Sequence, residues 1–364
     1  MTLLPHLKPK DSCRRDAVAL GEVMLRLDPG EGRIRSARHF QVWEGGGEYN
    51  VARGLAKTFR QRTAVVTALP RNDLGVLVHE LILQGGVSDA HILWREADPV
   101  GRENRVGLNF TERGFGPRGA LGVSDRAHSA ASAMQPDEVD WDALFGEEGV
   151  RWLHTGGIFS ALSESTAETA LAAVTAARRH GTVVSYDLNY RASLWAAHPD
   201  PEAARRVNRA IAEQVDVLIG DELSLAACLG IETFESRSDP CDPAPFAAAA
   251  GRLTDQLPNL RLLASPLRDP VTASMNRWGA CAWAGGVLTV HAPTEVAILD
   301  RVGGGDGFVS GLAFGLMDGR PLDEALALGV AHGALAMTTP GDNAMTSLDE
   351  VESLARGDGA AARR

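Results

Sequence analysis

The chain contains 364 residues, of which 45% are hydrophobic and 23% charged, and its formal net charge is −11. This length and composition suit a globular protein with a large folded core. The negative charge argues against a nucleic-acid partner or a membrane surface, because both favour a basic face, whereas a few local cations suffice to hold a small anion.

Strands and helices are expected to alternate in the first third of the chain. After residues 1–15, which two prolines and several charges predict to be flexible, the apolar residues 16–27 indicate a buried strand. Alternation within residues 30–42 predicts a half-exposed strand pair. The next elements are predicted as a helix at 51–59, a strand at 63–68 and a helix at 73–84 that ends at Gly85 and Gly86.

The pattern changes after residue 100. Residues 104–112 alternate like an exposed strand and precede a loop rich in glycine, proline and arginine. With residues 30–42, this segment is expected to form a small β flap outside the main sheet. After residue 141 the alternation resumes, which implies right-handed crossovers and a mostly parallel sheet. Strands are predicted at 152–155, 182–189, 215–220, 260–264 and 280–290, and helices at 166–180, 201–214, 245–257, 308–317 and 322–337, before a frayed end at 355–364.

A triple-glycine run stands between a strand-like stretch at 287–299 and the helix predicted at 308–317. Glycines lack Cβ, so successive N–H groups can point at one spot, and the helix dipole behind them favours an anion such as phosphate. A carboxylate beside such a site suits a base that takes a proton from an attacking hydroxyl. A glycine-rich turn with an aspartate N-cap is the alternative. The residues concerned are Gly303, Gly304, Gly305 and Asp306.

The run from Asp300 to Asp306 resembles the signature Asp-Thr-x-Gly-Ala-Gly-Asp of the ribokinase-like (phosphofructokinase-B) sugar kinases. The resemblance implies that the three glycines form an anion hole and that Asp306 is the catalytic base. Arg301 replaces the usual Thr, and Gly304 the usual Ala. This variant resembles that of kinases acting on 2-keto-3-deoxygluconate.

A second glycine cluster, at residues 45–47, also precedes a predicted helix, and a tight turn before a helix is its simplest explanation. Gly46, Gly47 and Asn50 nevertheless match the second signature of the same family, Gly-Gly-x-x-x-Asn-x-Ala. The resemblance implies that these residues contact the sugar. Small residues let a polyol approach the backbone, and the Asn50 amide offers both a donor and an acceptor.

Three polar side chains lie at the carboxyl end of the strand predicted at 182–189, the end where open parallel sheets bind ligands. They are Asp187, Asn189 and Arg191. An N-cap and surface ion pairs are the alternative. The run Asp-x-Asn-x-Arg-x-x-Leu-Trp resembles the 2-keto-3-deoxygluconate kinases, which implies that Arg191 binds the carboxylate of a sugar acid. A guanidinium fits a carboxylate bidentately.

The resemblance extends to the flap. Arg126 matches an arginine that contacts substrate from the lid, although a solvent-facing loop charge would explain it equally well. Asn109 stands where the family usually has a lid tyrosine, and it can form hydrogen bonds but cannot stack.

On the nucleotide side the match is looser. Asp221 and Ser224 stand where the family often has Asn-x-x-Glu, and residues 267–274 replace the usual Lys-x-Gly-x-x-Gly loop. Arg268 still offers a cation to an ATP phosphate. His332 falls where an adenine-side Asn is common, but a lone histidine on a helix is more often structural.

The resemblance covers residues 17 to 354 and implies one domain, at 16–354, with a three-layer α/β/α fold, a mostly parallel sheet and a β lid from 30–42 and 100–127. The implied reaction is ATP-dependent phosphorylation of a primary hydroxyl, with 2-keto-3-deoxy-D-gluconate as the favoured acceptor and Mg²⁺ bridging the phosphates. A homodimer formed through the lid also fits. One alternative is a sibling kinase for fructose, ribose or another sugar acid. Another is a sugar-acid-binding protein without phosphoryl transfer, suggested by the divergent nucleotide side.

The cysteines indicate a reducing compartment, because they lack metal-ligand spacing and are expected to be reduced thiols. The N-terminus has no apolar segment typical of a signal peptide, and no run of about 18 apolar residues could span a bilayer. A cytoplasmic protein without a dedicated metal site of its own is therefore expected. The four cysteines are Cys13, Cys228, Cys241 and Cys281.

Overall fold

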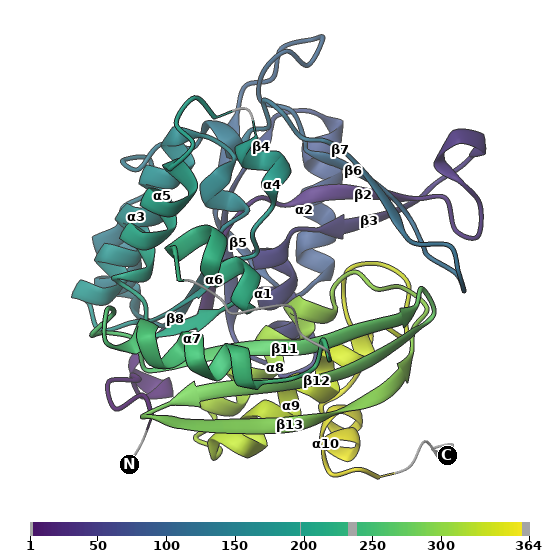
Figure 1. The fold of residues 1–364 in the computed structure, drawn as a ribbon. Coiled ribbons are helices and arrows are strands. Elements are labelled where there is room, and N and C mark those ends of the chain that lie inside the picture. The colour runs from purple at the N-terminus through teal and green to yellow at the C-terminus, as the bar shows by residue number, and fades with distance from the viewer. Residues whose placement is uncertain (1–2, 197, 232–238, 359–364) are drawn as a thin grey trace.

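The computed structural model describes residues 3–196, 198–231 and 239–358. Within this part of the chain, the centre of the molecule is a nine-stranded sheet of order β13-β12-β11-β10-β9-β8-β1-β4-β5 (Figure 1). The strands from β11 to β5 are parallel, and β12 and β13 add an antiparallel edge. The bounds are β1 (Arg15–Leu20), β4 (Thr63–Pro70), β5 (Ser88–Arg95), β8 (Val150–Gly156), β9 (Val183–Asp187), β10 (Val217–Ile219), β11 (Leu262–Thr272), β12 (Met275–Ala284) and β13 (Val287–Ala297).

Helices cover both faces of this sheet, because alternate strand residues point to opposite sides. In β1, Val18 packs with Val174 of α3, whereas Ala17 packs with Leu55 of α1 and Phe308 of α8. The predicted three-layer α/β/α architecture is confirmed. One layer holds α1 (Gly47–Lys57), α2 (Asp73–Gln84), α8 (Gly304–Met317), α9 (Leu322–Ala336) and α10 (Leu348–Ala355), and the other α3 (Glu164–Arg179), α5 (Ala203–Ala212), α6 (Glu222–Leu229) and α7 (Ala244–Thr254).

A separate four-stranded sheet of order β3-β2-β6-β7 stands out from one side of the body (Figure 1). Its strands are β2 (Met24–Asp28), β3 (Gln41–Gly45), β6 (Leu108–Glu112) and β7 (Leu121–Asp125). We call it the lid. Its tip contacts the β11–β12 turn, since Gly116 N donates to Ser274 Oγ at 2.9 Å and Ala273 N donates to Gly116 O at 2.8 Å.

Around the lid, the structure differs from two of the predicted strands. The stretch at 16–27 is not one strand but two, β1 in the main sheet and β2 in the lid. The chain bends at Gly21, where a Cβ would lie 2.5 Å from Glu48 Oε2. Residues 30–42 do not form a strand pair either. They contain the 3-10 turn Ile34–Ser36 and the start of β3, whose partner is β2.

Two further expectations differ from the structure. The strand predicted at 280–290 crosses a hairpin turn, because Gly285 and Gly286 have φ of +56° and +83° and separate β12 from β13. The leader packs against the body: Leu4 is only 4% exposed and joins the core around α8, which apolar burial explains. Residues 1–2 of the leader and 359–364 of the frayed end lie outside the described residues. No helix within the described residues is both long and apolar enough to cross a bilayer.

Candidate active site

A cavity of about 680 Å³ lies between the lid and the carboxyl ends of the parallel strands. The N-termini of α1 and α8 and the ends of β9 and β10 open onto it, as expected for a ligand site in an open α/β sheet. The predicted site residues that line it are Gly46, Gly47, Asn50, Asn109, Arg126, Asp187, Asn189, Arg191, Asp221, Ser224, Arg268, Gly303, Gly305 and Asp306.

The triple glycine forms the start of α8 rather than a loop before it. Gly303 is the N-cap with φ of +82°, and a Cβ there would lie 1.9 Å from Asp342 O, so only glycine fits. A Cβ at Gly305 would meet no atom within 4 Å, which leaves open space over the first helical turn. Gly304 differs from expectation, because it does not line the cavity and faces Met337 instead. The first-turn N–H groups and the helix dipole suit an anion.

Asp306 lies half-buried in this first turn. The Asn50 amide, from the first turn of α1, donates through Nδ2 to Asp306 Oδ2 at 2.7 Å. The pKa of Asp306 is raised to about 8, chiefly by burial; the Asn50 bond opposes this rise, and the nearby carboxylates Asp187, Asp342 and Glu48 contribute to it. A carboxyl group with this pKa can accept a proton near neutral pH.

Two carboxylates stand at the ends of neighbouring strands. The pKa of Asp187, the last residue of β9, is raised to about 6, chiefly by burial; the Asn189 N–H and the charge of Arg191 oppose this rise, and the charge of Asp221 contributes to it. Asp221 follows β10 and caps α6, because its Oδ1 accepts from Ser224 N at 2.8 Å. The pair gives this end of the cavity oxygen ligands of the kind that hard cations prefer.

Three arginines lie near these carboxylates: Arg191, Arg268 and Arg301. Burial first, and then the proximity of Arg301, lowers the pKa of Arg268. None of the three forms an ion pair with a carboxylate within the described part of the chain. Neighbouring guanidiniums repel one another unless an anion lies between them, so the cluster favours an anionic ligand. Arg301 was not among the predicted binding residues, although a cation in the glycine turn was a visible signal.

Arg126 reaches the cavity from the lid, but it already has an acidic partner. Its Nη2 donates to Glu22 Oε2, and Glu22 is only 2% exposed. Glu22 lies in the bend between β1 and β2, and nothing in the sequence pattern predicted this pair. Asn109, on β6, donates from Nδ2 to Thr111 Oγ1 at 3.1 Å.

Comparison with known proteins decides the class of this site. Residues 14–349 match the pfkB family carbohydrate kinase model. The chain is a pfkB-family carbohydrate kinase. It is therefore a phosphotransferase with an alcohol group as acceptor, and enzymes of this family use ATP.

The kinase is similar to named sugar-acid kinases along nearly its whole length. The 2-dehydro-3-deoxygalactonokinase of Haloferax volcanii is 32% identical, over 94% of this chain and 97% of that protein. The 5-dehydro-2-deoxygluconokinase of Geobacillus thermodenitrificans is 24% identical, over 97% and 95%. The crystal structure of 2-dehydro-3-deoxygluconokinase from Thermotoga maritima is 33% identical and superposes with a TM-score of 0.85, covering 94% of this chain and 99% of that one. The ribokinase-like fold is thereby confirmed.

His332 does not line the cavity of the kinase, so the nucleotide contact expected for it finds no support in this geometry. It is 1% exposed between α1 and α8, where its Nδ1 lies 2.8 Å from Ser310 Oγ and its Nε2 lies 3.2 Å from Thr58 Oγ1. Burial lowers the pKa of His332 to about 4. It is a neutral core residue that joins two helices.

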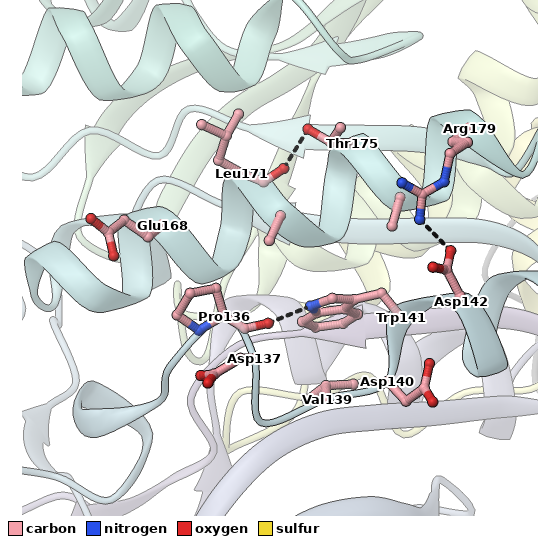
Figure 2. A pocket seen from close by; sticks show the side chains of 12 residues that line it. Pro136, Asp137, Val139, Asp140, Trp141, Asp142, Glu168, Leu171, Thr175 and Arg179 are labelled. Carbon is pink, nitrogen blue, oxygen red and sulfur yellow. Dashed lines mark hydrogen bonds and ion pairs between the residues drawn. The ribbon is translucent and has the colours of Figure 1, made fainter.

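A second hollow on the surface of the kinase contains none of the predicted site residues. Figure 2 shows it beside α3, where Trp141 Nε1 donates to Pro136 O at 2.8 Å and Arg179 pairs with Asp142. It holds neither a glycine-rich helix start nor an unpaired cation suited to phosphate. The cavity under the lid is therefore the candidate active site.

Proposed function

We propose that the kinase transfers the γ-phosphoryl group of ATP to the primary hydroxyl of a 2-keto-3-deoxy sugar acid, with 2-keto-3-deoxy-D-gluconate as the favoured acceptor. The observation that carries the proposal is the Asp306 carboxyl at the start of α8, bonded to Asn50 in a cavity lined by four arginines. On a protein of net charge −11, such a cluster of cations favours two anionic substrates. The named relatives, which act on deoxy keto acids, support the choice.

In the proposed reaction Asp306 accepts the proton of the acceptor hydroxyl. The hydroxyl oxygen then bonds to the γ-phosphorus while the bond from that phosphorus to the β-phosphate oxygen breaks, which leaves ADP. Asn50 orients the Asp306 carboxylate toward the hydroxyl. The N–H groups at the start of α8, around Gly303 and Gly305, stabilise the charge on the transferred group.

Recognition of the acceptor is proposed for both ends of the molecule. Arg191 binds the carboxylate of the acceptor. Arg126 also binds this carboxylate, from the lid, after its ion pair with Glu22 has broken. Gly46, Gly47, Asn50, Asn109 and Asn189 contact the hydroxyls. At Gly46, φ is +141° and a Cβ would lie 2.1 Å from Glu22 O, so the position requires glycine. Without a side chain, the backbone at Gly46 allows the sugar to approach closely.

The phosphate side suits ATP with Mg²⁺. Mg²⁺ is usually held by one or two carboxylates together with substrate phosphates and water, and Asp187 and Asp221 offer such a pair. Bound there, the ion would neutralise phosphate charge. Arg268 and Arg301 are proposed to hold the phosphates of the nucleotide. Closure of the lid keeps water, a competing acceptor, away from the phosphoryl group.

Two properties of the molecule as a whole complete the proposal. The outer side of the lid exposes apolar side chains, with Leu121 44% and Val123 46% exposed, and a second copy is proposed to cover it. The enzyme is placed in the cytoplasm, because the cysteine usage fits a reducing compartment.

The test is a panel of acceptors assayed by ADP release with ATP and Mg²⁺. We expect turnover of 2-keto-3-deoxy acids and little of fructose or ribose. Arg191→Ala should lower kcat/KM on the acids by roughly 10- to 150-fold, since a charge-assisted bond contributes about 1.5–3 kcal/mol. Arg105→Ala, on a lid arginine paired with Asp125 outside the cavity, is the control. Equal turnover of neutral sugars would overturn the acceptor assignment, and binding of acid without ADP release would overturn the phosphoryl transfer.

A further inference from the structure

Arg26, on lid strand β2, is 0% exposed, an unusual position for a guanidinium. Its Nη1 donates to Asp342 Oδ1 at 2.6 Å, and its Nη2 donates to Asp300 Oδ2 at 2.5 Å and Asp28 Oδ2 at 3.4 Å. A second lid arginine, Arg113, donates to Asp28 Oδ2 at 2.9 Å. A buried cation persists only where such partners neutralise it, so the cluster is tightly constrained.

The partners of Arg26 flank the start of α8. Asp300 Oδ1 accepts from Val302 N at 3.2 Å, which shapes the turn just before Gly303. The carbonyl oxygen of Asp342 packs against Gly303 so closely that a Cβ there would lie 1.9 Å away. One guanidinium therefore holds both segments that enclose the N-cap of α8.

Asp342 also reaches the other glycine cluster. A Cβ at Gly45 would lie 2.4 Å from Asp342 Oδ2, so this carboxylate packs on the end of β3, directly before the turn that starts α1. One buried ionic cluster thus contacts lid strand β2, the end of β3 before α1 and the turn before α8. A displacement of Arg26 would be felt at both helix starts, since packed groups transmit shifts.

We propose that Arg26 is a positioning residue for phosphoryl transfer, which acts from the lid through Asp300 and Asp342 to aim the first N–H groups of α8 at the transferred group. The inference rests on the proposed function. Because these donors stabilise charge that develops in the transition state, misaligning them lowers kcat more than it raises KM. Arg26 itself does not line the cavity.

The test compares Arg26→Lys, Arg26→Met and Arg26→Ala in the full-length enzyme. We expect kcat to fall about 10- to 100-fold with KM for ATP and for the sugar acid changed less than about threefold. Guanidinium chloride, at millimolar levels far below those that denature proteins, should restore part of kcat in Arg26→Ala. Arg151→Met removes another buried arginine, at the amino end of β8, and should lower stability without lowering kcat.

Wild-type kcat in either folded Arg26→Lys or Arg26→Met would overturn the inference, and so would an effect on KM alone or an absence of guanidinium rescue. If Arg26→Met does not fold, Arg26→Lys, which keeps the charge, decides the matter by its kcat. Asp306→Asn separates this inference from the proposed function. An inactive Asp306→Asn enzyme beside fully active Arg26 variants would overturn only the positioning role, whereas a fully active Asp306→Asn enzyme would overturn the proposed function itself.

Discussion

Replacing Asn50 by alanine should move the pH profile of the kinase. Asn50 donates its amide hydrogen to Asp306 Oδ2 at 2.7 Å, and this bond favours the ionised carboxylate and lowers its pKa. Burial opposes it and leaves the pKa of Asp306 at about 8 in the free enzyme. Without the amide, nothing replaces the donated hydrogen, so the pKa of Asp306 rises further.

The size of the shift follows from the strength of the bond. A hydrogen bond to a charged group contributes roughly 1.5–3 kcal/mol, and each pKa unit corresponds to about 1.36 kcal/mol, so the pKa of Asp306 should rise by about one to two units. The acidic limb of kcat/KM, which reports the free enzyme, should move from about pH 8 to about pH 9–10. At pH 7, below both values, kcat/KM should fall about 10- to 100-fold, and most of the loss should disappear at high pH.

The assay is ADP release at limiting sugar acid between pH 6 and pH 10. Asn109→Ala is the matched control, because Asn109 lines the same cavity but bonds to Thr111 and not to Asp306. That variant should raise KM and leave the limb in place. An acidic limb of Asn50→Ala that coincides with that of the wild type would refute the reasoning.

Two further predictions concern the start of α8. Gly303→Ala should lower the free energy of unfolding by roughly 1–3 kcal/mol and lower kcat as well, because φ is +82° and the new Cβ would clash with Asp342 O. Gly305→Ala, where a Cβ would meet no atom within 4 Å, should have the melting temperature of the wild type but bind ATP more weakly. Equal melting temperatures for the two variants would contradict this prediction. Asp306 titrates at about 8 when folded and 3.8 when unfolded, so the folded state holds a proton that the unfolded state releases, and stability contributed by this group is lost as pH rises from 4 to 8. Asp306→Asn should therefore gain stability relative to the wild type as pH rises from 5 to 8, by up to about 4 kcal/mol at about 1.36 kcal/mol per pH unit, as measured by urea unfolding. A pH-independent difference would count against the raised pKa.

Elements with local signals could be predicted from the sequence. Helix α2 has the predicted bounds 73–84, because the Asn72 side chain caps it and Gly85 and Gly86 follow it. The break between β1 and β2 could not be predicted. The run 16–27 stays apolar across the bend, and the close packing of Gly21 against Glu48 involves an element outside this run. Whether a strand leaves its sheet depends on partners distant in sequence.

The residues of the site also divide into those that a local sequence pattern predicts and those that it does not. Both glycine clusters and the polar residues after β9 carry local patterns, and the structure brings them together in one cavity. Glu22 lies 104 residues from its partner Arg126, and Asp342 lies 316 residues from its partner Arg26, so no local pattern shows these two pairs. His332 was placed by family position alone, whereas its place between packed helices makes it a core residue.

The central claim is that the Asp306 carboxylate takes the proton from the acceptor hydroxyl. Asp306→Asn keeps the shape of the side chain but removes the base, and it is best measured as kcat for ATP-dependent phosphorylation of 2-keto-3-deoxy-D-gluconate at pH 8. A general base contributes about 10²- to 10⁴-fold, so kcat should fall at least about 100-fold while KM for both substrates stays within a few-fold. A folded Asp306→Asn enzyme with kcat within tenfold of the wild type would contradict the account.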